Sequence, residues 1–151
     1  MASQKKTERY LRIYQQLKEL LDRPGDRDSR MATVVAVLHH KMEPFFWTGF
    51  YCLTNDELIV RTYQGPLACQ ILKKNTGVCW TAILQQKTII VPDVHKFPGH
   101  IACDSRSQSE IVIPMKDNNG KITGVLDIDS EELNAFDEID AENLEKIVGL
   151  I

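Results

Sequence analysis

The chain has 151 residues, and this length suits a single domain that buries a hydrophobic core without disulfides or metals to hold it together. With a formal net charge of −3 it lacks the basic field that attracts a nucleic acid backbone, so we expect no nucleic-acid partner. No apolar stretch is long enough to span a membrane and the N-terminus lacks a signal-peptide pattern, which indicates a soluble, cytoplasmic protein without membrane contact.

Residues 1–45 are expected to form a helical segment. Apolar residues recur at helical spacing from Tyr10 to Leu21, and Pro24 and Gly25 end this first helix. Ser29 is expected to cap a second helix, whose apolar face carries Met31, Val34, Val35 and Leu38. Neither helix carries residues in a catalytic pattern, so both are interpreted as scaffold.

Residues 46–151 are expected to hold a sheet, a long loop and a last helix. The β-prone stretches FWTGFYCL and ELIVRTY flank a turn at 54–56 and predict an antiparallel hairpin. A short helix over 78–84 and the strand TIIVP follow, and Pro92 ends that strand.

The C-terminal part predicts a second hairpin and a helix. EIVIPM and ITGVLDID are joined by a tight turn at Asn119 and Gly120, and Asp137 or Asp140 caps the helix that follows. The whole pattern predicts an α+β fold in one domain over residues 1–151, with an antiparallel sheet and helices packed on one face.

A long loop is expected between these two halves of the sheet. From Pro92 to Gln108 the apolar residues follow neither the helical nor the strand period, and long loops inside compact domains usually carry function. Cys103 lies in this loop, within PGHIACDS, between His100 and Asp104. A thiol in a polar loop favours a reactive interpretation over a buried one.

The four cysteines raise the expectation of thiol chemistry, because cysteines of a cytoplasmic protein are seldom structural cross-links. Cys69 follows a turn at 65–66, and Cys79 lies at the start of the short helix, whose N-terminus favours the thiolate and so lowers the pKa of a thiol. A buried, inert Cys79 is an equal alternative. Cys52 alternates within a strand and is interpreted as a sheet residue.

A zinc site is the competing use of four cysteines and four histidines. Structural zinc sites nearly always contain closely spaced ligand pairs, but no two cysteines here lie closer than ten residues. Only His95 and His100 have a suitable spacing. We therefore predict no metal.

Carboxylates form a second candidate site. Asp127 and Asp129 are two residues apart in a predicted strand and so lie on one face, and Glu110 opens the neighbouring strand, where it could lie across from them. In a pocket such a group would bind an ammonium or share a proton, whereas the alternative is a solvated edge.

Two aromatic residues share a strand face in the same way. Trp47 and Tyr51 could wall a pocket for a small cation or a methyl group, although such residues are more often core.

A series of segments then stands in the chain at fixed intervals: WTGFY, QGPLAC, GVC, VPDVHKFPGHIACDS, SEIVIP and GVLDIDS. In this order they resemble the free methionine-(R)-sulfoxide reductases, small enzymes made of one GAF domain. The resemblance runs from about Trp47 to Phe136 and includes the spacing of its three cysteines. Trp80 stands where the family usually has a small residue, and Cys52 lies outside its pattern.

The resemblance implies a thiol mechanism without a bound cofactor. Cys103 attacks the sulfoxide sulfur and becomes a sulfenic acid, Cys69 resolves it as an intramolecular disulfide, and Cys79 assists. Thioredoxin, supplied with electrons from NADPH by thioredoxin reductase, then restores both thiols. The family also makes a homodimer an expectation.

The resemblance also implies a substrate pocket. One protonated carboxyl group gives its proton to the sulfoxide oxygen and the others meet the ammonium of the amino acid, among Glu110, Asp127 and Asp129. Trp47 and Tyr51 enclose the S-methyl end. The alternative is a non-catalytic GAF domain that senses a small ligand, but such domains are usually fused to an output domain and do not need three spaced cysteines. A zinc-stabilised interaction domain is a more distant alternative.

Overall fold

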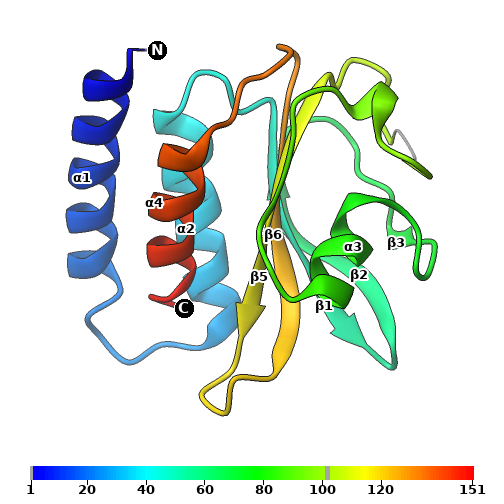
Figure 1. Cartoon of the computed structure of the whole chain (residues 1–151). Helices are drawn as coiled ribbons and strands as arrows, with labels where there is room; N and C mark the ends of the chain where they lie inside the picture. The colour runs from blue at the N-terminus through cyan, green and yellow to red at the C-terminus, as the bar shows by residue number, and fades with distance from the viewer. Residues whose placement is uncertain (1, 101–102) are drawn as a thin grey trace.

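A computed structural model describes residues 2–100 and 103–151, and these residues form a six-stranded antiparallel sheet between two layers of helix (Figure 1). The strands lie in the order β3-β2-β1-β6-β5-β4. Their bounds are Trp47–Thr54 for β1, Glu57–Gln64 for β2, Ile71–Leu72 for β3, Ile89–Val91 for β4, Ser109–Lys116 for β5 and Ile122–Ser130 for β6. The helices are α1 (Ser3–Leu20), α2 (Arg27–Lys41), α3 (Gly77–Gln85) and α4 (Glu138–Val148).

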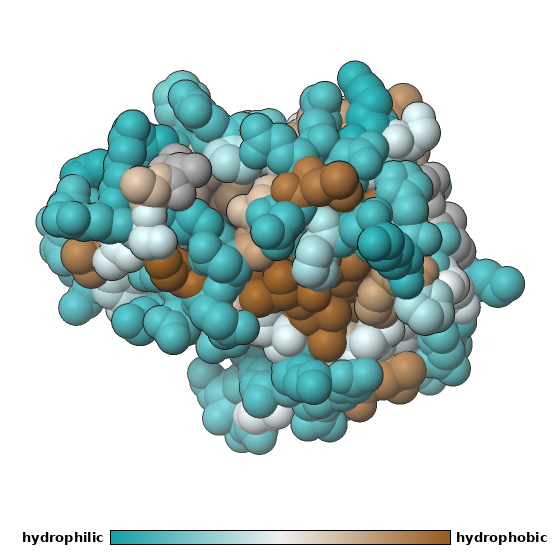
Figure 2. Space-filling view, turned by 45° about the horizontal axis from the view of Figure 1, so that its top comes forward, coloured by the Kyte–Doolittle hydropathy of each residue, from teal (hydrophilic) through white to brown (hydrophobic). Residues whose placement is uncertain are grey.

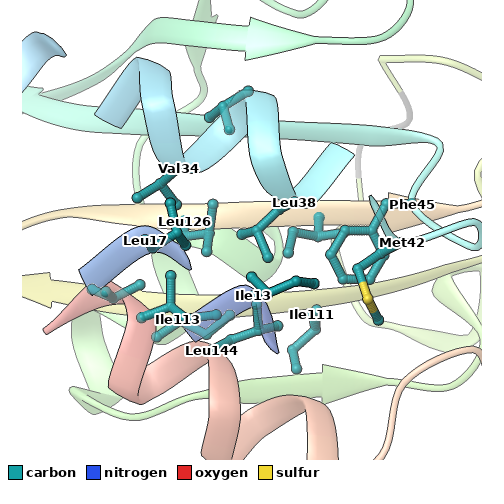
Figure 3. Packing of buried hydrophobic residues seen from close by; sticks show 14 of the residues in the cluster. Ile13, Leu17, Val34, Leu38, Met42, Phe45, Ile111, Ile113, Leu126 and Leu144 are labelled. Atoms are coloured by element: carbon teal, nitrogen blue, oxygen red, sulfur yellow. The ribbon is translucent and has the colours of Figure 1, made fainter. Parts of the chain in front are cut away.

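The expected α+β fold is confirmed, and one of its faces holds the main core. Helix α2 lies over β1 and β2 and α4 over β5, and α1 packs on both helices from the outside, so that apolar side chains of all three helices join one buried cluster with the sheet (Figures 1 and 3). Figure 3 shows Leu17, Leu38 and Leu144 from the three helices pointing towards Ile113 and Leu126 of the sheet. Burying each such side chain stabilises the fold by about 1.5–3 kcal/mol, so this layer is the main source of stability.

Helix α3 differs from the expectation that the helices share one face, because it lies against the opposite side of the sheet (Figure 1). Its residues Val78, Trp80 and Ala82 belong to a second buried cluster with Val112 and Val125 of the central strands. The side chains of these strands alternate between faces, so each face presents an apolar surface that a helix must cover. Trp80, the residue that departs from the family pattern, fills part of this second cluster.

The helix caps refine two sequence predictions. Helix α2 begins at Arg27, and its N-cap is Asp26, whose carboxylate accepts a hydrogen bond from the Ser29 backbone N–H at 2.7 Å. The prediction that Ser29 is the cap was wrong, because Ser29 supplies the donor that the cap satisfies. In α4 both candidates act together, since Asp137 caps the helix and the Asp140 carboxylate accepts a hydrogen bond from the backbone N–H of Asp137.

Backbone hydrogen bonds join the start of the long loop to its end and its end to β6. The Val94 backbone N–H donates to the Gln108 carbonyl at 2.9 Å, and the Gln108 N–H donates to the Ser130 carbonyl at 2.7 Å. A single 3-10 turn, Val94–Lys96, is the regular structure among its described residues. Residues 101 and 102 of this predicted loop lie outside the described residues. The hydrogen bonds at its base hold the loop against the end of β6.

The surface mixes polar and apolar residues. The face in Figure 2 is largely hydrophilic, with apolar residues gathered near its middle. Among the helices that the structure describes, none has the length and apolar character needed to cross a membrane.

A buried ion pair ties the first helix to the last. The ammonium of Lys6 in α1 lies 2.7 Å from Asp140 Oδ2 in α4, and the Tyr10 hydroxyl donates to Asp140 Oδ1 at 2.6 Å. All three side chains are buried. Breaking a buried pair by removing one partner leaves an uncompensated charge, which is strongly destabilising.

We therefore predict that Lys6→Met lowers the free energy of unfolding by about 3 kcal/mol, because Asp140 stays buried without its cation. Urea denaturation followed by circular dichroism measures this loss. Lys5→Met is the matched control, since Lys5 is exposed on the same helix, and its effect is expected to stay within about 0.5 kcal/mol. Equal losses for the two variants would contradict the role given to the pair.

Candidate active site

The register of the three central strands places the acidic residues side by side. Glu110 of β5 is paired with Asp129 of β6, and Asp127 shares the face of Asp129 because two residues separate them along one strand. On the other side of β6, Trp47 of β1 is paired with Asp129. The neighbours of opposite parity, such as Ile128, point into the helix-covered core. One face of the sheet thus carries all three carboxylates and the tryptophan.

Aromatic rings wall this face on the β1 side. Trp47 stacks on Tyr51 with ring centroids 5.8 Å apart and on Tyr63 of β2 at 5.2 Å. Gly49 lies between the two β1 aromatics, and a side chain there would overlap both the Trp47 ring and Tyr63. Sequence reasoning missed Tyr63 and Gly49. The alternation of β2 could have indicated Tyr63, but the stacking of its ring on Trp47 depends on the register between β1 and β2.

A pocket opens over this face. Its floor is formed by the carboxylates, its aromatic wall by Trp47 and Tyr51, and its opposite wall by the start of α3, including Cys79. The segment 65–72 and the loop that carries His100 and Cys103 complete the lining. All the predicted site residues line this pocket except Cys69, which joins it through its bond to Cys103.

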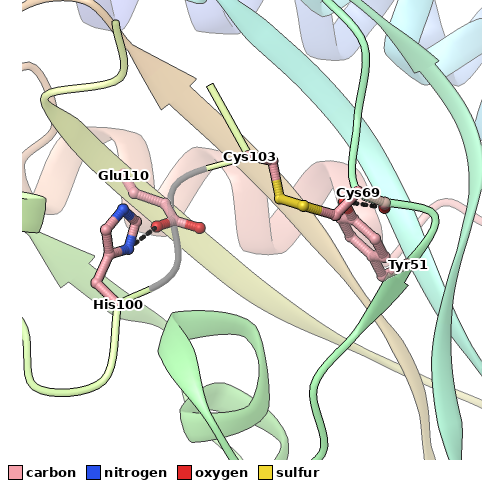
Figure 4. Close-up of a disulfide and its surroundings, with 5 residues drawn as sticks. All are labelled: Tyr51, Cys69, His100, Cys103 and Glu110. Carbon is pink, nitrogen blue, oxygen red and sulfur yellow. Dashed lines mark hydrogen bonds and ion pairs between the residues drawn. A yellow bond between two sulfur atoms is a disulfide. The ribbon is translucent and has the colours of Figure 1, made fainter. Parts of the chain in front are cut away.

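Cys69 and Cys103 form a disulfide at the rim of this pocket (Figure 4). Their Cα atoms are 5.4 Å apart although 34 positions separate them in sequence. The Tyr51 hydroxyl donates a hydrogen bond to the Cys69 carbonyl at 2.9 Å, which holds the Cys69 backbone against β1. Cys103 is exposed and Cys69 half-buried, so solvent reaches the disulfide. The structure therefore brings two of the predicted thiols into a redox pair.

The segment that follows Cys103 is anchored by its own contacts. The Arg106 guanidinium donates to both oxygens of Asp104 and lies 4.9 Å above the centre of the Phe46 ring. Cation–π contacts of this kind and the bidentate ion pair restrict the backbone near the disulfide. Cys103 is thus presented by a segment fixed to the start of β1.

The environment of Cys79 corrects the expectation of a lowered pKa. Cys79 lies in the first turn of α3 but is only 4% exposed. Burial raises the pKa of its thiol, and the nearby charges of Asp127 and Glu110 raise it further. Burial and these charges raise the pKa of Cys79 by more than the helix N-terminus lowers it. Cys79 is therefore a protonated thiol at neutral pH.

Cys52, by contrast, lies away from this pocket and contacts Met31, as its interpretation as a sheet residue implies.

Because all three carboxyl groups are buried close together, ionising them at the same time is unfavourable. Burial raises the pKa of Glu110, and the charges of Asp127 and Asp129 raise it further, as does a hydrogen bond to Asp127. Burial also raises the pKa of Asp129 and of Asp127, but hydrogen bonds from Glu110 and Cys79 favour the ionised form of Asp127. These directions favour the proton on Glu110, with Asp127 as the carboxylate that accepts a hydrogen bond from it.

Polar atoms of the pocket are left without partners. Among the described residues, buried atoms that lack a hydrogen bond include Asp127 Oδ1, Trp47 Nε1 and His100 Nε2. His100 Nδ1 lies 4.0 Å from Glu110 Oε2 (Figure 4), and burial lowers the pKa of the imidazole, which therefore stays neutral. Buried polar atoms are nearly always satisfied in proteins, so this set points to a polar ligand that offers a donor to Asp127 Oδ1 and an acceptor to the Trp47 N–H.

The pocket also contains potential metal ligands. One ligand atom each of Cys79, Glu110 and Asp127 lies within 4.8 Å of the others. The spacing rules used on the sequence could not find this group, because its members come from α3, β5 and β6. His100 was noted only as a neighbour of Cys103, and its contact with Glu110 is likewise a product of the fold.

Comparison with known proteins places the chain among similar sequences and structures. The GAF domain family matches residues 26–151. "GAF domain-containing protein A" of Dictyostelium discoideum is 48% identical over 147 residues, 97% of this chain and 92% of that protein. The free methionine-R-sulfoxide reductase of Escherichia coli (strain K12) is 37% identical over 144 residues, 95% and 87% of the two chains. The free methionine-R-sulfoxide reductase of Neisseria meningitidis, solved in complex with its substrate, matches with a TM-score of 0.92 and 39% identity over 99% of this chain and 89% of that one.

The acidic pocket predicts an unusual dependence of stability on pH. Because the pKa of Glu110 is higher in the folded state than in the unfolded chain, its contribution is complete below about pH 4 and is lost as the pH rises through the folded pKa. We predict that Glu110→Gln is more stable than the wild type at pH 8 by about 1 kcal/mol or more, with a smaller difference at pH 4.5. Thermal unfolding at both pH values measures the change.

Glu57→Gln is the control for this prediction, since Glu57 is exposed on β2. Its difference from the wild type is expected to stay the same at the two pH values. A stability gain for Glu110→Gln that does not grow with pH would argue against a protonated Glu110.

Proposed function

The chain belongs to the GAF domain family and, within it, to the free methionine-R-sulfoxide reductases, and from this premise we propose that it is an oxidoreductase that reduces free L-methionine-(R)-sulfoxide to L-methionine. The observation that carries the proposal is the Cys69–Cys103 disulfide at the rim of a buried acidic pocket. This is the oxidised product that the reaction leaves on the enzyme.

The proposed reaction conserves atoms and electrons in three steps. The Cys103 thiolate attacks the sulfoxide sulfur, whose oxygen takes up a proton. The oxygen then passes to the Cys103 sulfur as the sulfur–oxygen bond of the substrate and the transient sulfur–sulfur bond break, which releases methionine and leaves a sulfenic acid on Cys103. The Cys69 thiol then attacks this sulfur, which releases water and forms the disulfide. A dithiol reductant finally reduces the disulfide by thiol–disulfide exchange, which returns both cysteines to thiols and oxidises the reductant to its own disulfide. Methionine sulfoxide is reduced at the expense of that dithiol.

Glu110 is assigned as the proton donor to the sulfoxide oxygen. It is buried, it keeps its proton because burial and the neighbouring carboxylates raise its pKa, and it lines the pocket that Cys103 borders. Asp127 and Asp129 are assigned to the ammonium of the substrate. The unpartnered Asp127 Oδ1 supports this role, because an ammonium would supply the hydrogen bond that this atom lacks.

The aromatic wall accounts for the choice of substrate. Trp47 and Tyr51 are assigned to the S-methyl group, whose apolar contact with their rings would orient the sulfur towards Cys103. A substrate whose ammonium meets the carboxylates must have a free amino group, which an internal residue of a peptide chain lacks. Both features support a preference for the free amino acid.

The reductant and the setting follow from the same chemistry. We assign thioredoxin, recycled by NADPH and thioredoxin reductase, because the exposed sulfur of Cys103 suits attack by a protein dithiol. Such dithiols are kept reduced in the cytoplasm, which is therefore the proposed location. Cys79 is placed beside the reacting carboxylates rather than in the disulfide, so its assistance would act through Asp127. A homodimer is retained from the resemblance. A GAF domain that only senses a ligand has no need of the disulfide, which disfavours that alternative.

Replacing each thiol should separate the steps of the reaction. Cys103→Ser is expected to form no methionine, because it removes the nucleophile. Cys69→Ser is expected to form one equivalent of methionine per chain and then stop with thioredoxin as reductant, because the sulfenic acid is not converted into a disulfide. Rapid quenching and chromatographic quantification of methionine measure both outcomes.

Cys52→Ser is the matched control, since Cys52 is a thiol on the opposite side of the sheet, and its turnover is expected to equal that of the wild type. Continued multiple turnover by Cys103→Ser would show that another residue is the nucleophile.

A further inference from the structure

A cluster of three side chains within the pocket has ligand chemistry that the reductase mechanism does not require. Cys79 from the first turn of α3, Glu110 from β5 and Asp127 from β6 place one sulfur and two carboxylate oxygens within 4.8 Å of one another. All three residues are buried. The thiol of Cys79 takes no part in the disulfide, which leaves it free to act as a ligand.

Within the described part of the chain, the cluster contains a buried carboxylate without a cationic partner and an acceptor atom without a hydrogen bond. No lysine or arginine among residues 2–100 and 103–151 forms an ion pair with Glu110, Asp127 or Asp129. The imidazole of His100, 4.0 Å from Glu110, is neutral. Asp127 is only 6% exposed, and its Oδ1 atom has no hydrogen-bond partner although the residue faces the pocket. A buried carboxylate oxygen in this situation can be completed by a hydrogen-bond donor or by a cation, and a metal ion would also neutralise its charge.

We propose that Cys79, Glu110 and Asp127 bind a thiophilic divalent cation, with Zn²⁺ as the type, and that this ion occupies the pocket in place of the sulfoxide substrate. The exclusion of substrate rests on the function proposed above, whereas the binding of the ion does not. The sulfur ligand selects zinc or cadmium over magnesium and calcium, which take oxygen ligands. Three protein ligands and an open fourth position form a familiar zinc arrangement.

The geometry is close to that of a bound ion. Zinc–sulfur and zinc–oxygen bonds of about 2.3 and 2.1 Å hold the ligand atoms of a tetrahedral site about 3.5 Å apart. Binding replaces the protons of Cys79 and Glu110, so it releases protons and strengthens as the pH rises.

The ion would exclude the substrate because it uses the same groups. Asp127 is assigned to the substrate ammonium and Glu110 to the sulfoxide oxygen, and an ion between them takes both. The effect would make a zinc-loaded chain an inactive reductase whose disulfide chemistry is otherwise intact.

The test uses protein in which the Cys69–Cys103 disulfide is formed, so that Cys52 and Cys79 are the remaining thiols. Titration calorimetry with Zn²⁺ gives the number of bound ions, and the ultraviolet thiolate-to-metal band with Cd²⁺ reports a sulfur ligand. We expect one ion per chain in the wild type and in Cys52→Ser. Cys79→Ser is expected to lose the band, and both Cys79→Ser and Asp127→Asn to bind Zn²⁺ at least about tenfold more weakly.

Unchanged affinity in Cys79→Ser, or no binding by the wild type, would overturn the site. Two different substitutions and a check of thermal unfolding separate ligand loss from misfolding. Free methionine sulfoxide is expected to weaken the apparent Zn²⁺ affinity of the wild type, and an unchanged affinity would overturn the exclusion. If the chain binds zinc through Cys79 but reduces no sulfoxide, the proposed metal site is supported and the proposed reductase activity is refuted.

Discussion

The pairing of β6 with β1 on one side and β5 on the other is the constraint on which the site depends. This register puts Asp127, Asp129 and Glu110 on the same face, beside Trp47, while residues of opposite parity such as Ile128 enter the core under α1, α2 and α4. A shift of β6 by one residue would exchange the two sets and place carboxylates in the apolar core. The stability of the helix-covered face therefore holds the reactive face in its arrangement.

The acidic pocket is an unfavourable feature that the fold supports because it serves a ligand. Burial without a nearby cation raises the pKa of Glu110, and Asp127 Oδ1 is an acceptor without a hydrogen-bond partner among the described residues. The same charge that suits a substrate ammonium also suits a metal ion once Cys79 is nearby. The proton donation, the substrate recognition and the zinc binding that we propose thus all depend on one buried cluster.

The sequence predicted most helices and strands and singled out several residues that line the pocket. It did not predict the properties that depend on strand register and on burial. Alternation predicted that Asp127 and Asp129 share a face, and the motif resemblance singled out Cys69 and Cys103. The helix position of Cys79 suggested a lowered pKa, whereas burial raises it, and burial is a tertiary property that local spacing does not encode. The place of α3 on the second face and the stacking of Tyr63 on Trp47 also depend on contacts between distant segments.

Stereospecific reduction of the free amino acid is tested by NADPH oxidation with thioredoxin and thioredoxin reductase. The assay supplies the separate R and S epimers of free L-methionine sulfoxide and a peptide-bound sulfoxide. We expect multiple turnovers with the free R epimer and none above background with the other two substrates. Equal turnover of both epimers, or no turnover of any of them by folded, metal-free protein, would contradict the proposal.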